Sequence, residues 1–313
     1  MQSSVLRIGT RGSPLALAQA TMVQAQLASA HGVVEHGLAA EAFELKIIRT
    51  SGDVIQDRPL SEVGGKGLFT KEIEEALIAG EIDLAVHSAK DLPTLLPPGL
   101  AIVSALPRED PRDVFISRKA KTLRALAEGA TVGTASLRRQ ALVKRLRPDL
   151  KVVTFRGNVE TRLRKLDEGL VDATLLALAG LRRLGLAEAA TAILDTEEFL
   201  PAVGQGIIAL ETRADDARTR ALLDRINSPD DATALAAERA FLTVLDGSCR
   251  TPIAGHAKVA AGRVSFRGLI AKPDGSQVFE TTREGTAAQA SALGRDAGRE
   301  LKERAGAGFF APV

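Results

Sequence analysis

Residues 8–14 read IGTRGSP and have the composition of a strand end, a tight turn and a helix start. Ser13 can cap the helix, and Pro14 suits its first turn because proline lacks the amide hydrogen that a first turn leaves unpaired. Residues 132–140, VGTASLRRQ, and residues 154–162, TFRGNVETR, repeat this order of residue types. Strands that lead directly into helices are typical of parallel sheets covered by helices.

This alternation of strand and helix extends over most of the chain. We expect strands at Val5–Gly9, Phe43–Ile48, Ile82–Val86, Ile102–Ala105, Val114–Ser117, Thr131–Gly133, Val152–Phe155, Ala173–Ala177 and Ile207–Leu210. Helices are expected after Ser13 and at Leu68–Ala79, Leu137–Arg147 and Val159–Glu168. Beyond about residue 225 we expect a helix at Ala232–Leu245, strands at Ile253–Val259, Val264–Ile270 and Val278–Thr282, and a helix at Ala287–Arg304. The sequence therefore predicts an α/β fold with mainly parallel sheets, followed by a small α+β C-terminal domain.

The length of 313 residues is enough for two or three domains. We expect domain 1 at residues 1–106 and 201–224, domain 2 at 107–200 and domain 3 at 225–313. The crossings fall in segments that contain proline, one of them reading LPREDPRD. The first domain is therefore predicted to be discontinuous in sequence.

Composition excludes several classes of protein. A single cysteine leaves no internal disulfide framework and no all-cysteine metal site, and the four histidines lack the spacing of metal ligands. The net charge of +2 provides no strong overall field for nucleic acid or membranes, and no apolar run is long enough to span a membrane. The first residues do not resemble a secretory signal, so we expect a cytoplasmic protein with a reduced thiol.

Arginine is the one compositional excess, with 29 Arg among the 41 basic residues. Each of the three turns places an arginine close to a residue that can cap a helix. Helix N-termini attract anions, and guanidinium groups bind carboxylate or phosphate through two hydrogen bonds. The three turns therefore indicate a small polyanionic ligand, although solvated surface arginines and a GC-rich genome are the simpler interpretations.

The stretch from Arg138 to Lys165 is strongly basic. It contains ten Lys or Arg residues and only two acids, as a nucleic-acid-binding patch would. Phe155 is its only aromatic residue, and no nucleic-acid-binding motif is present. Nucleic acid is therefore the less favoured partner.

Two polar segments follow the early strands. In residues 87–91, HSAKD, a carboxylate at Asp91 among many cations could exchange a proton or stabilise a cation, although a helix N-cap or an ion pair with Lys90 is the simpler interpretation. Residues 63–67, VGGKG, do not fit the Walker phosphate loop. The polar stretch from residue 50 to 67 is expected to be either a lid over a site or a solvent loop.

Cys249 lies in the polar sequence DGSCR, residues 246–250, and not in an apolar run. A neighbouring cation makes a thiol more nucleophilic, and a thiolate in such a loop could anchor a covalent group. An inert buried cysteine is the commoner case.

The chain resembles the porphobilinogen deaminase family in nine segments: RIGTRGSPLALAQA, GGKGLFTKEIE, DLAVHSAKDLP, REDPRD, VGTASLRRQ, FRGNVETRL, AGLRRLGL, LPAVGQG and GSCRTP. They occur in the family's order between Arg7 and about Pro252, and the resemblance is weaker beyond. It implies two lobes like those of periplasmic binding proteins, plus a small domain that carries a cofactor cysteine.

The resemblance also implies an activity. It is that of a transferase that joins four porphobilinogen molecules, with release of ammonia, into the linear tetrapyrrole hydroxymethylbilane of haem and porphyrin biosynthesis. The primer would be a dipyrromethane attached by a thioether to Cys249. Asp91 matches the catalytic aspartate, which would hold pyrrole N–H groups, protonate the leaving amine and stabilise the azafulvene cation. Lys66 matches the mobile loop that covers the site.

Porphobilinogen carries an acetate and a propionate, so the growing chain accumulates carboxylates. The resemblance places ten residues at carboxylate-binding positions or beside them: Arg11, Ser88, Lys90, Thr134, Ser136, Arg138, Arg139, Arg156, Arg162 and Arg183. We expect a monomer whose partners are porphobilinogen and the growing polypyrrole, acting without metal, nucleotide, nucleic acid or membrane. The rival interpretation is a non-catalytic two-lobe binding protein for a carboxylated ligand, which would need neither Cys249 nor Asp91.

Overall fold

The computed structural model describes residues 5–33, 41–54, 67–245, 252–306 and 308–309. The chain forms two compact units, which we describe separately. The first takes residues 1–55, 65–109 and 207–232, and the second takes residues 56–64, 110–206 and 233–313. The predicted division into three domains stays a prediction.

The first unit contains a five-stranded sheet. In spatial order its strands are β2 (Phe43–Ile48), β1 (Leu6–Arg11), β3 (Leu84–Ser88), β10 (Ile208–Arg213) and β4 (Leu100–Ala105). β1 is parallel to β2 and β3, whereas β10 is antiparallel to both β3 and β4. Four strands therefore share one direction, and β10 is the reversed strand of an otherwise parallel sheet.

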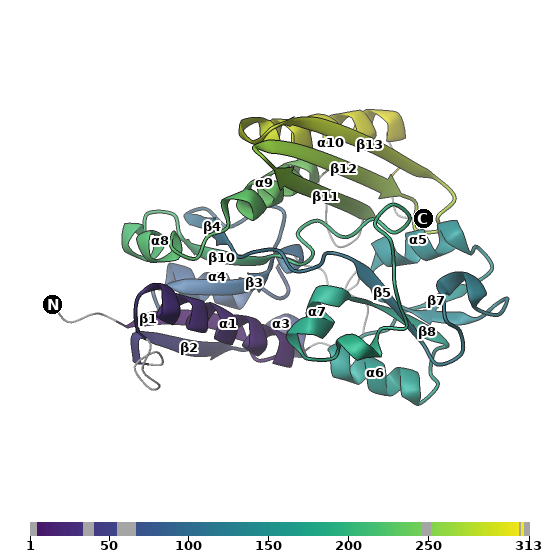
Figure 1. The fold of residues 1–313 in the computed structure, drawn as a ribbon, viewed down its shortest axis with the longest axis horizontal. Coiled ribbons are helices and arrows are strands. Elements are labelled where there is room, and N and C mark those ends of the chain that lie inside the picture. The colour runs from purple at the N-terminus through teal and green to yellow at the C-terminus, as the bar shows by residue number, and fades with distance from the viewer. Residues whose placement is uncertain (1–4, 34–40, 55–66, 246–251, 307, 310–313) are drawn as a thin grey trace. The chain divides into compact units, whose positions relative to one another are not determined.

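Helices cover both faces of this sheet (Figure 1). On one face α1 (Pro14–Ala30) packs against the apolar side chains of β1 and β3, and α8 (Ala217–Leu223) adds Leu223 to the same cluster. On the other face α4 (Lys71–Ile78) packs over Ala85. The short helix α3 (Ser51–Val54) precedes α4. The expected α/β layering is thus confirmed for this unit.

The strand β3 lies two residues further along the chain than the sequence predicts. It runs from Leu84 to Ser88, because Ser88 and His87 pair with Ile208 and Ala209 of the antiparallel strand β10. This pairing partner is distant in sequence, and a local pattern cannot reveal it. The shift places His87 and Ser88 inside the sheet rather than in the loop that follows it.

The second unit contains another mixed five-stranded sheet. In spatial order its strands are β7 (Lys151–Val153), β6 (Thr131–Gly133), β8 (Ala173–Ala177), β5 (Asp113–Ser117) and β9 (Ala192–Ile193). Here β5 is the strand that runs antiparallel to its neighbours. The helix α5 (Leu137–Leu146) packs on one face, and α6 (Val159–Asp167) and α7 (Leu178–Arg183) pack on the other. The sequence did not predict α7 or α8.

The C-terminal part of the second unit is an antiparallel three-stranded sheet with two helices. The strands are β11 (Ile253–Ala260), β12 (Arg263–Ala271) and β13 (Val278–Thr286), and the helices are α9 (Pro229–Leu245) and α10 (Ala290–Ala305). Phe241 of α9 and Phe266 of β12 form the centre of its core, with ring centroids 5.1 Å apart. The predicted α+β pattern is confirmed, and α10 begins three residues later than expected because Ala287–Gln289 form a 3-10 turn.

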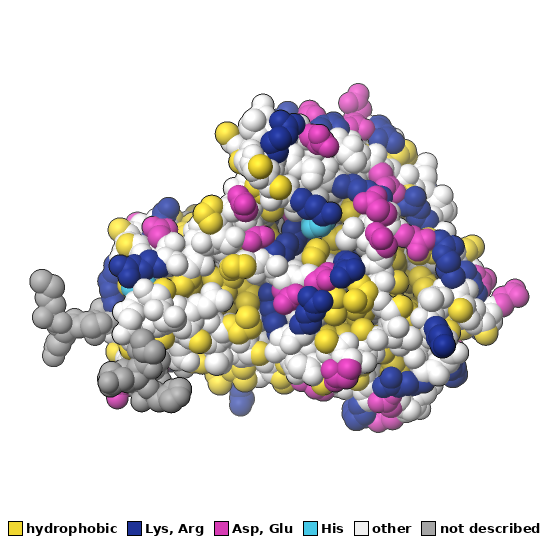
Figure 2. Space-filling view, in the orientation of Figure 1, with side chains coloured by type: hydrophobic (Ala, Val, Ile, Leu, Met, Phe, Trp, Pro, Cys, Tyr) yellow, Lys and Arg dark blue, Asp and Glu magenta, His cyan; other side chains and the backbone are white. Residues whose placement is uncertain are grey.

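The surface carries charges of both signs. Figure 2 shows Lys and Arg side chains interspersed with Asp and Glu on the visible face. In the basic stretch from residue 138 to 165, five arginines pair with acids of this chain: Arg138 and Arg139 with Asp113, Arg145 with Glu280, Arg147 with Asp149 and Arg164 with Glu168. Much of the positive charge of this stretch is therefore paired with carboxylates of the same chain.

Candidate active site

Three strand-to-helix turns form as the sequence predicts. The Oγ of Ser13 accepts a hydrogen bond from the Ala16 amide at the start of α1, at 3.4 Å. Ser136 caps α5 in the same way, at 3.3 Å, and Oδ1 of Asn158 caps α6, at 2.8 Å. Each cap follows the carboxyl end of a strand, where ligands of parallel sheets bind.

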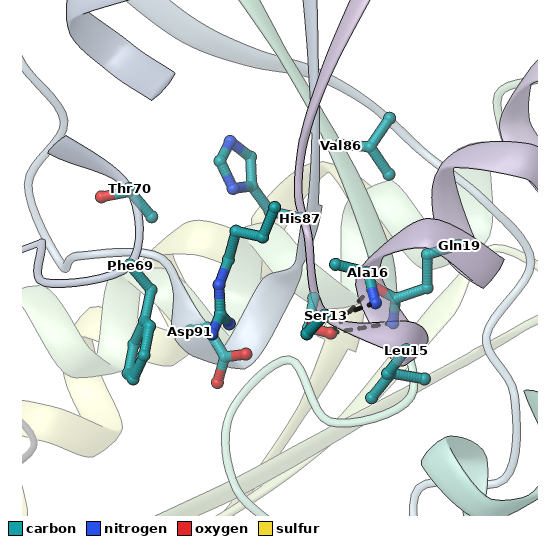
Figure 3. A pocket seen from close by; sticks show the side chains of 11 residues that line it. Ser13, Leu15, Ala16, Gln19, Phe69, Thr70, Val86, His87 and Asp91 are labelled. Carbon is teal, nitrogen blue, oxygen red and sulfur yellow. Dashed lines mark hydrogen bonds between the residues drawn. The ribbon is translucent and has the colours of Figure 1, made fainter. Parts of the chain in front are cut away.

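In the first unit, a cavity of about 40 Å³ lies at the carboxyl ends of β1 and β3. Arg11, Ser88 and Asp91 line it, so the structure brings together three of the residues that the sequence singles out. Figure 3 shows Asp91 from the segment after β3, with Ser13 and Gln19 of the α1 start across from it. The cavity combines a carboxylate, a guanidinium group and a hydroxyl group.

Two contacts position the polar groups of this cavity. The guanidinium carbon of Arg11 lies 4.2 Å from the ring centroid of Phe69, within the range of a cation–π interaction. Nε2 of Gln19 donates a hydrogen bond to Oγ of Ser88, at 2.8 Å. The sequence did not single out Gln19 or Phe69, although both lie inside segments that carry the family resemblance.

Asp91 ends a short 3-10 turn, Ala89–Asp91, that follows β3 directly. The amide of Ala89 donates to the carbonyl of Ile207 at 2.9 Å, which ties the turn to the start of β10. Lys90 and Asp91 are exposed, so the turn is anchored while its charged side chains face outward. This arrangement suits a carboxylate that must meet a substrate.

In the second unit, the turns after β6 and β7 lie side by side because these strands are parallel neighbours. Thr134 is buried after β6, and its Oγ1 accepts from the amide of Ser136 at 3.1 Å. Arg156 lies half-buried in the turn after β7, and Nε of Arg162 donates to the carbonyl of Gly157 at 2.8 Å. Two arginine-bearing helix starts therefore meet at one edge of the sheet.

Arg138 and Arg139 are buried at the start of α5 and share one carboxylate. Nη2 of Arg138 lies 2.7 Å from Oδ2 of Asp113, and Nη2 of Arg139 lies 2.6 Å from Oδ1. Burial lowers the pKa of Arg138, and the Asp113 charge opposes this effect. Nε2 of Gln205 also donates to Asp113, at 3.1 Å. The sequence reasoning missed Asp113 as their partner, although it lies in the LPREDPRD segment.

Of the remaining predicted residues, the structure describes Arg183 but not Lys66 or Cys249. Arg183 ends α7 and donates from Nη2 to the carbonyl of Gly206, at 2.6 Å. Lys66, most of the predicted lid at residues 50–67, and Cys249 lie outside the described residues. The structure therefore positions ten of the carboxylate-binding candidates and Asp91, but neither the lid lysine nor the cofactor cysteine.

Two general findings apply to the described part of the chain. Within it, no group of three His, Cys, Asp or Glu side chains is arranged to hold a metal ion. None of its helices is both long enough and apolar enough to cross a membrane.

Comparison with protein families assigns both parts of the chain. A model described as "Porphobilinogen deaminase, dipyromethane cofactor binding domain" matches residues 6–221, and one described as "Porphobilinogen deaminase, C-terminal domain" matches residues 232–303. The chain belongs to the porphobilinogen deaminase family. The family expected from the sequence motifs is thus confirmed.

Curated porphobilinogen deaminases support this membership over the full length. Those of Nitrobacter winogradskyi and Nitrobacter hamburgensis are 64% and 63% identical over 315 aligned residues, which cover 99% of this chain and 98% of each relative. The chain is therefore an enzyme of tetrapyrrole biosynthesis, a transferase that carries the dipyrromethane-binding domain of its family. The non-catalytic binding-protein interpretation is not favoured.

Solved structures of periplasmic binding proteins are also similar to this chain. A periplasmic substrate-binding protein from Coxiella burnetii has a TM-score of 0.43 and 16% identity, covering 75% of this chain and 97% of its own. The aliphatic sulphonate-binding protein SsuA from Escherichia coli has a TM-score of 0.42 and 16% identity, with coverages of 79% and 72%. These values are too low to transfer a ligand or an activity.

Proposed function

We propose that this chain joins four porphobilinogen molecules into hydroxymethylbilane, with Asp91 as the catalytic carboxylate. The observation that supports this assignment is the cavity at the end of β3, where Asp91, Arg11 and Ser88 come together. A carboxylate can stabilise the cation that remains when an amine leaves. Asp91 would hold the pyrrole N–H groups and protonate the leaving nitrogen.

The carboxylates of the substrate require cationic partners, and both units supply them. In the first unit Arg11 is held by Phe69, and Ser88 offers a hydroxyl group beside it. Bidentate binding to guanidinium fixes an acid group in orientation, which brings the reacting carbons into line. We propose that Lys90, on the same turn as Asp91, contributes a further positive charge.

The donors of the second unit suit the four acid side chains of a dipyrromethane. Arg138, Arg139 and Asp113 together carry one net positive charge in a buried position, which favours an added anion. Thr134, Ser136, Arg156, Arg162 and Arg183 are proposed to complete this set. When bound, the dipyrromethane would supply the terminal pyrrole carbon to which the first substrate is joined. We assign its attachment to the thiol of Cys249.

We also propose that the enzyme works as a cytoplasmic monomer without nucleic acid. The net charge of +2 and the interspersed surface charges provide no strong basic field for nucleic acid, which supports the last part of this proposal. Sedimentation at several concentrations should give one species with the mass of a single chain. Concentration-dependent association would contradict it.

Intact mass measurement of the purified native chain tests the cofactor assignment. We expect an excess over the sequence mass that equals two linked pyrrole units. The excess should disappear in Cys249→Ser, because serine offers a much weaker nucleophile than a thiolate. An unmodified mass in protein that is active would contradict the proposal.

A further inference from the structure

Three buried titratable side chains converge behind the cavity of the first unit. They are Glu74 from α4, His87 from β3 and Glu211 from β10, which are 5%, 5% and 0% exposed. Because Ala209 pairs with His87 and Glu211 pairs with Ala85, the His87 and Glu211 side chains lie on the same face of the sheet. That face is the one covered by α4.

Four polar atoms of this cluster make no hydrogen bond among the described residues. Nε2 of His87 lies 3.0 Å from Oε2 of Glu211, yet neither atom has the geometry of a hydrogen bond. The other carboxylate oxygen of Glu211 and Oε1 of Glu74 also make no hydrogen bond. Buried atoms of this kind are rare in folded proteins and indicate a ligand or ordered water. Three of these atoms are carboxylate oxygens, which favour a ligand that donates hydrogen bonds.

One residue of the cluster, His87, also lines the cavity of the candidate active site. His87 and Thr70 line the same cavity as Asp91, and Figure 3 shows them together on one side of the pocket. The cavity of about 40 Å³ has room for water-sized molecules. A small molecule released beside Asp91 would therefore lie next to His87, at the edge of the cluster.

The charge balance of the cluster is acidic. Burial raises the pKa of Glu74, and the Glu211 carboxylate adds to this increase, while Thr70 and His87 oppose it. Of the other elements packed on β3, β1 contributes Arg11 to the cavity wall, the turn after β3 contributes Asp91, and α1 has no charged residue. Glu74 therefore keeps its proton to a higher pH than an exposed glutamate does.

We propose that the Glu74–His87–Glu211 cluster is an ammonium-binding site, which receives the ammonia that each condensation releases. This inference rests on the proposed function, since condensation is the source of the ammonia. The C–N bond of the protonated aminomethyl group breaks, and its electron pair leaves with the nitrogen as neutral ammonia. The ammonia then takes the proton of the Glu74 carboxyl group, giving ammonium and a carboxylate.

This proton transfer is favourable because amines are much stronger bases than carboxylates, with pKa values of about 10 for an alkylammonium and about 4 for a glutamate. Ammonium can donate to the carboxylates of Glu74 and Glu211 at once. Once protonated, the nitrogen has no lone pair with which to attack the carbon that it left. The site would therefore make the release step harder to reverse.

Ammonium binding can be measured on the holoenzyme without turnover. We expect ammonium chloride to raise the melting temperature more than potassium or sodium chloride at the same ionic strength. Calorimetry in buffers of different ionisation enthalpy should show that binding releases a proton. The affinity should rise with pH, because the neutral Glu74 acid must lose its proton. An equal response to potassium, or none to ammonium, would overturn the assignment.

Two variants and a matched control sharpen the test. Glu74→Gln should fold normally, since the amide has nearly the shape of the carboxyl group, but should lose the response to ammonium and the proton release. Glu211→Gln should weaken ammonium binding about tenfold or more, as expected for a lost hydrogen bond to a charged group. Glu75→Gln is the control, because Glu75 is the exposed neighbour on the same helix. An unchanged ammonium response in Glu74→Gln would refute the site.

A parallel condensation assay separates the two proposals. If the native enzyme forms hydroxymethylbilane but does not bind ammonium, the ammonium site is wrong and the proposed function stands. If it binds ammonium with proton release but forms no product, the proposed function is wrong and the binding site stands.

Discussion

Arg139 holds Asp113 through two hydrogen bonds in the interior of the second unit, with Nε and Nη2 at 3.0 and 2.6 Å from Oδ1. Arg138 binds the other oxygen of the same carboxylate. Two arginines that the sequence assigns to ligand carboxylates therefore already bind a carboxylate of the protein. A ligand carboxylate that binds these two arginines must therefore either bind alongside Asp113 or take its place.

Asp113→Asn should strongly destabilise the enzyme. The substitution leaves two buried guanidinium groups without their counter-charge, and breaking a buried pair in this way costs about 3–5 kcal/mol. The free energy of unfolding from urea denaturation measures the loss. Asp167→Asn is the control, because the Arg118–Asp167 pair is largely exposed and should contribute less than about 1 kcal/mol. Similar losses in both variants would show that Asp113 does not have this role.

Asp91→Ala should keep the fold and lose most of the turnover. Asp91 is exposed and ends a turn that backbone hydrogen bonds hold, so its side chain contributes little to stability. Loss of a general acid typically lowers rates about 100-fold or more. Product formation and circular dichroism measure the two effects. The exposed Asp215→Ala variant should match the native enzyme in both, and near-native activity in Asp91→Ala would remove Asp91 from the mechanism.

Gly275→Ala should destabilise the contact between the β12–β13 turn and α5. Gly275 has a φ of +71°, and a methyl group there would lie 2.7 Å from the carbonyl oxygen of Ala141 on α5. Gly262→Ala is the matched control, since Gly262 has a φ of +73° with open space around it. We expect a loss of about 1 kcal/mol in Gly262→Ala from backbone strain alone. Overpacking against α5 should add about 1–3 kcal/mol to this loss of stability in Gly275→Ala. Equal midpoints of urea denaturation in the two variants would contradict the close contact between the turn and α5.

Glu300→Gln should destabilise the C-terminal sheet at neutral pH but not in strong acid. Hydrogen bonds from Thr281 and Arg283 lower the pKa of Glu300 to about 2, from an ordinary value of 4.5. A carboxylate with a lowered pKa stabilises the fold above pH 4.5, and this contribution disappears as the pH falls through about 2.

The melting temperatures of Glu300→Gln and the native chain should therefore differ at pH 7 and converge near pH 2. The difference should be modest and should shrink in high salt, because the group is partly exposed. Glu303→Gln, on the exposed side of the same helix, provides the control. A pH-independent difference for Glu300→Gln would contradict the prediction.

Elements with strong local patterns were predictable from the sequence. Thr131–Gly133 and Phe43–Ile48 form the predicted strands, and Ser13 and Ser136 cap the predicted helices. These features depend on side chains within a few residues of one another. In contrast, β3 was displaced by two residues, because its end is fixed by pairing with β10 more than 100 residues away.

The candidate site was predictable only in part. The motifs correctly led to Arg11, Ser88 and Asp91, which meet at one cavity. Gln19 and Phe69 were missed, because a glutamine or a phenylalanine in a sequence does not by itself indicate a binding or catalytic role. Their roles follow from contacts with Ser88 and Arg11 across the ends of neighbouring elements.

The sequence alone determined the family, the three capped strand-to-helix turns and the α/β to α+β change, because motifs and hydrophobic periods are local properties. Only the tertiary structure decided that Arg138 and Arg139 bind Asp113, and that Glu74, His87 and Glu211 meet behind the cavity. The physical reason is burial. Charges removed from water must find partners, and those partners are chosen by sheet order and helix packing rather than by neighbours along the chain.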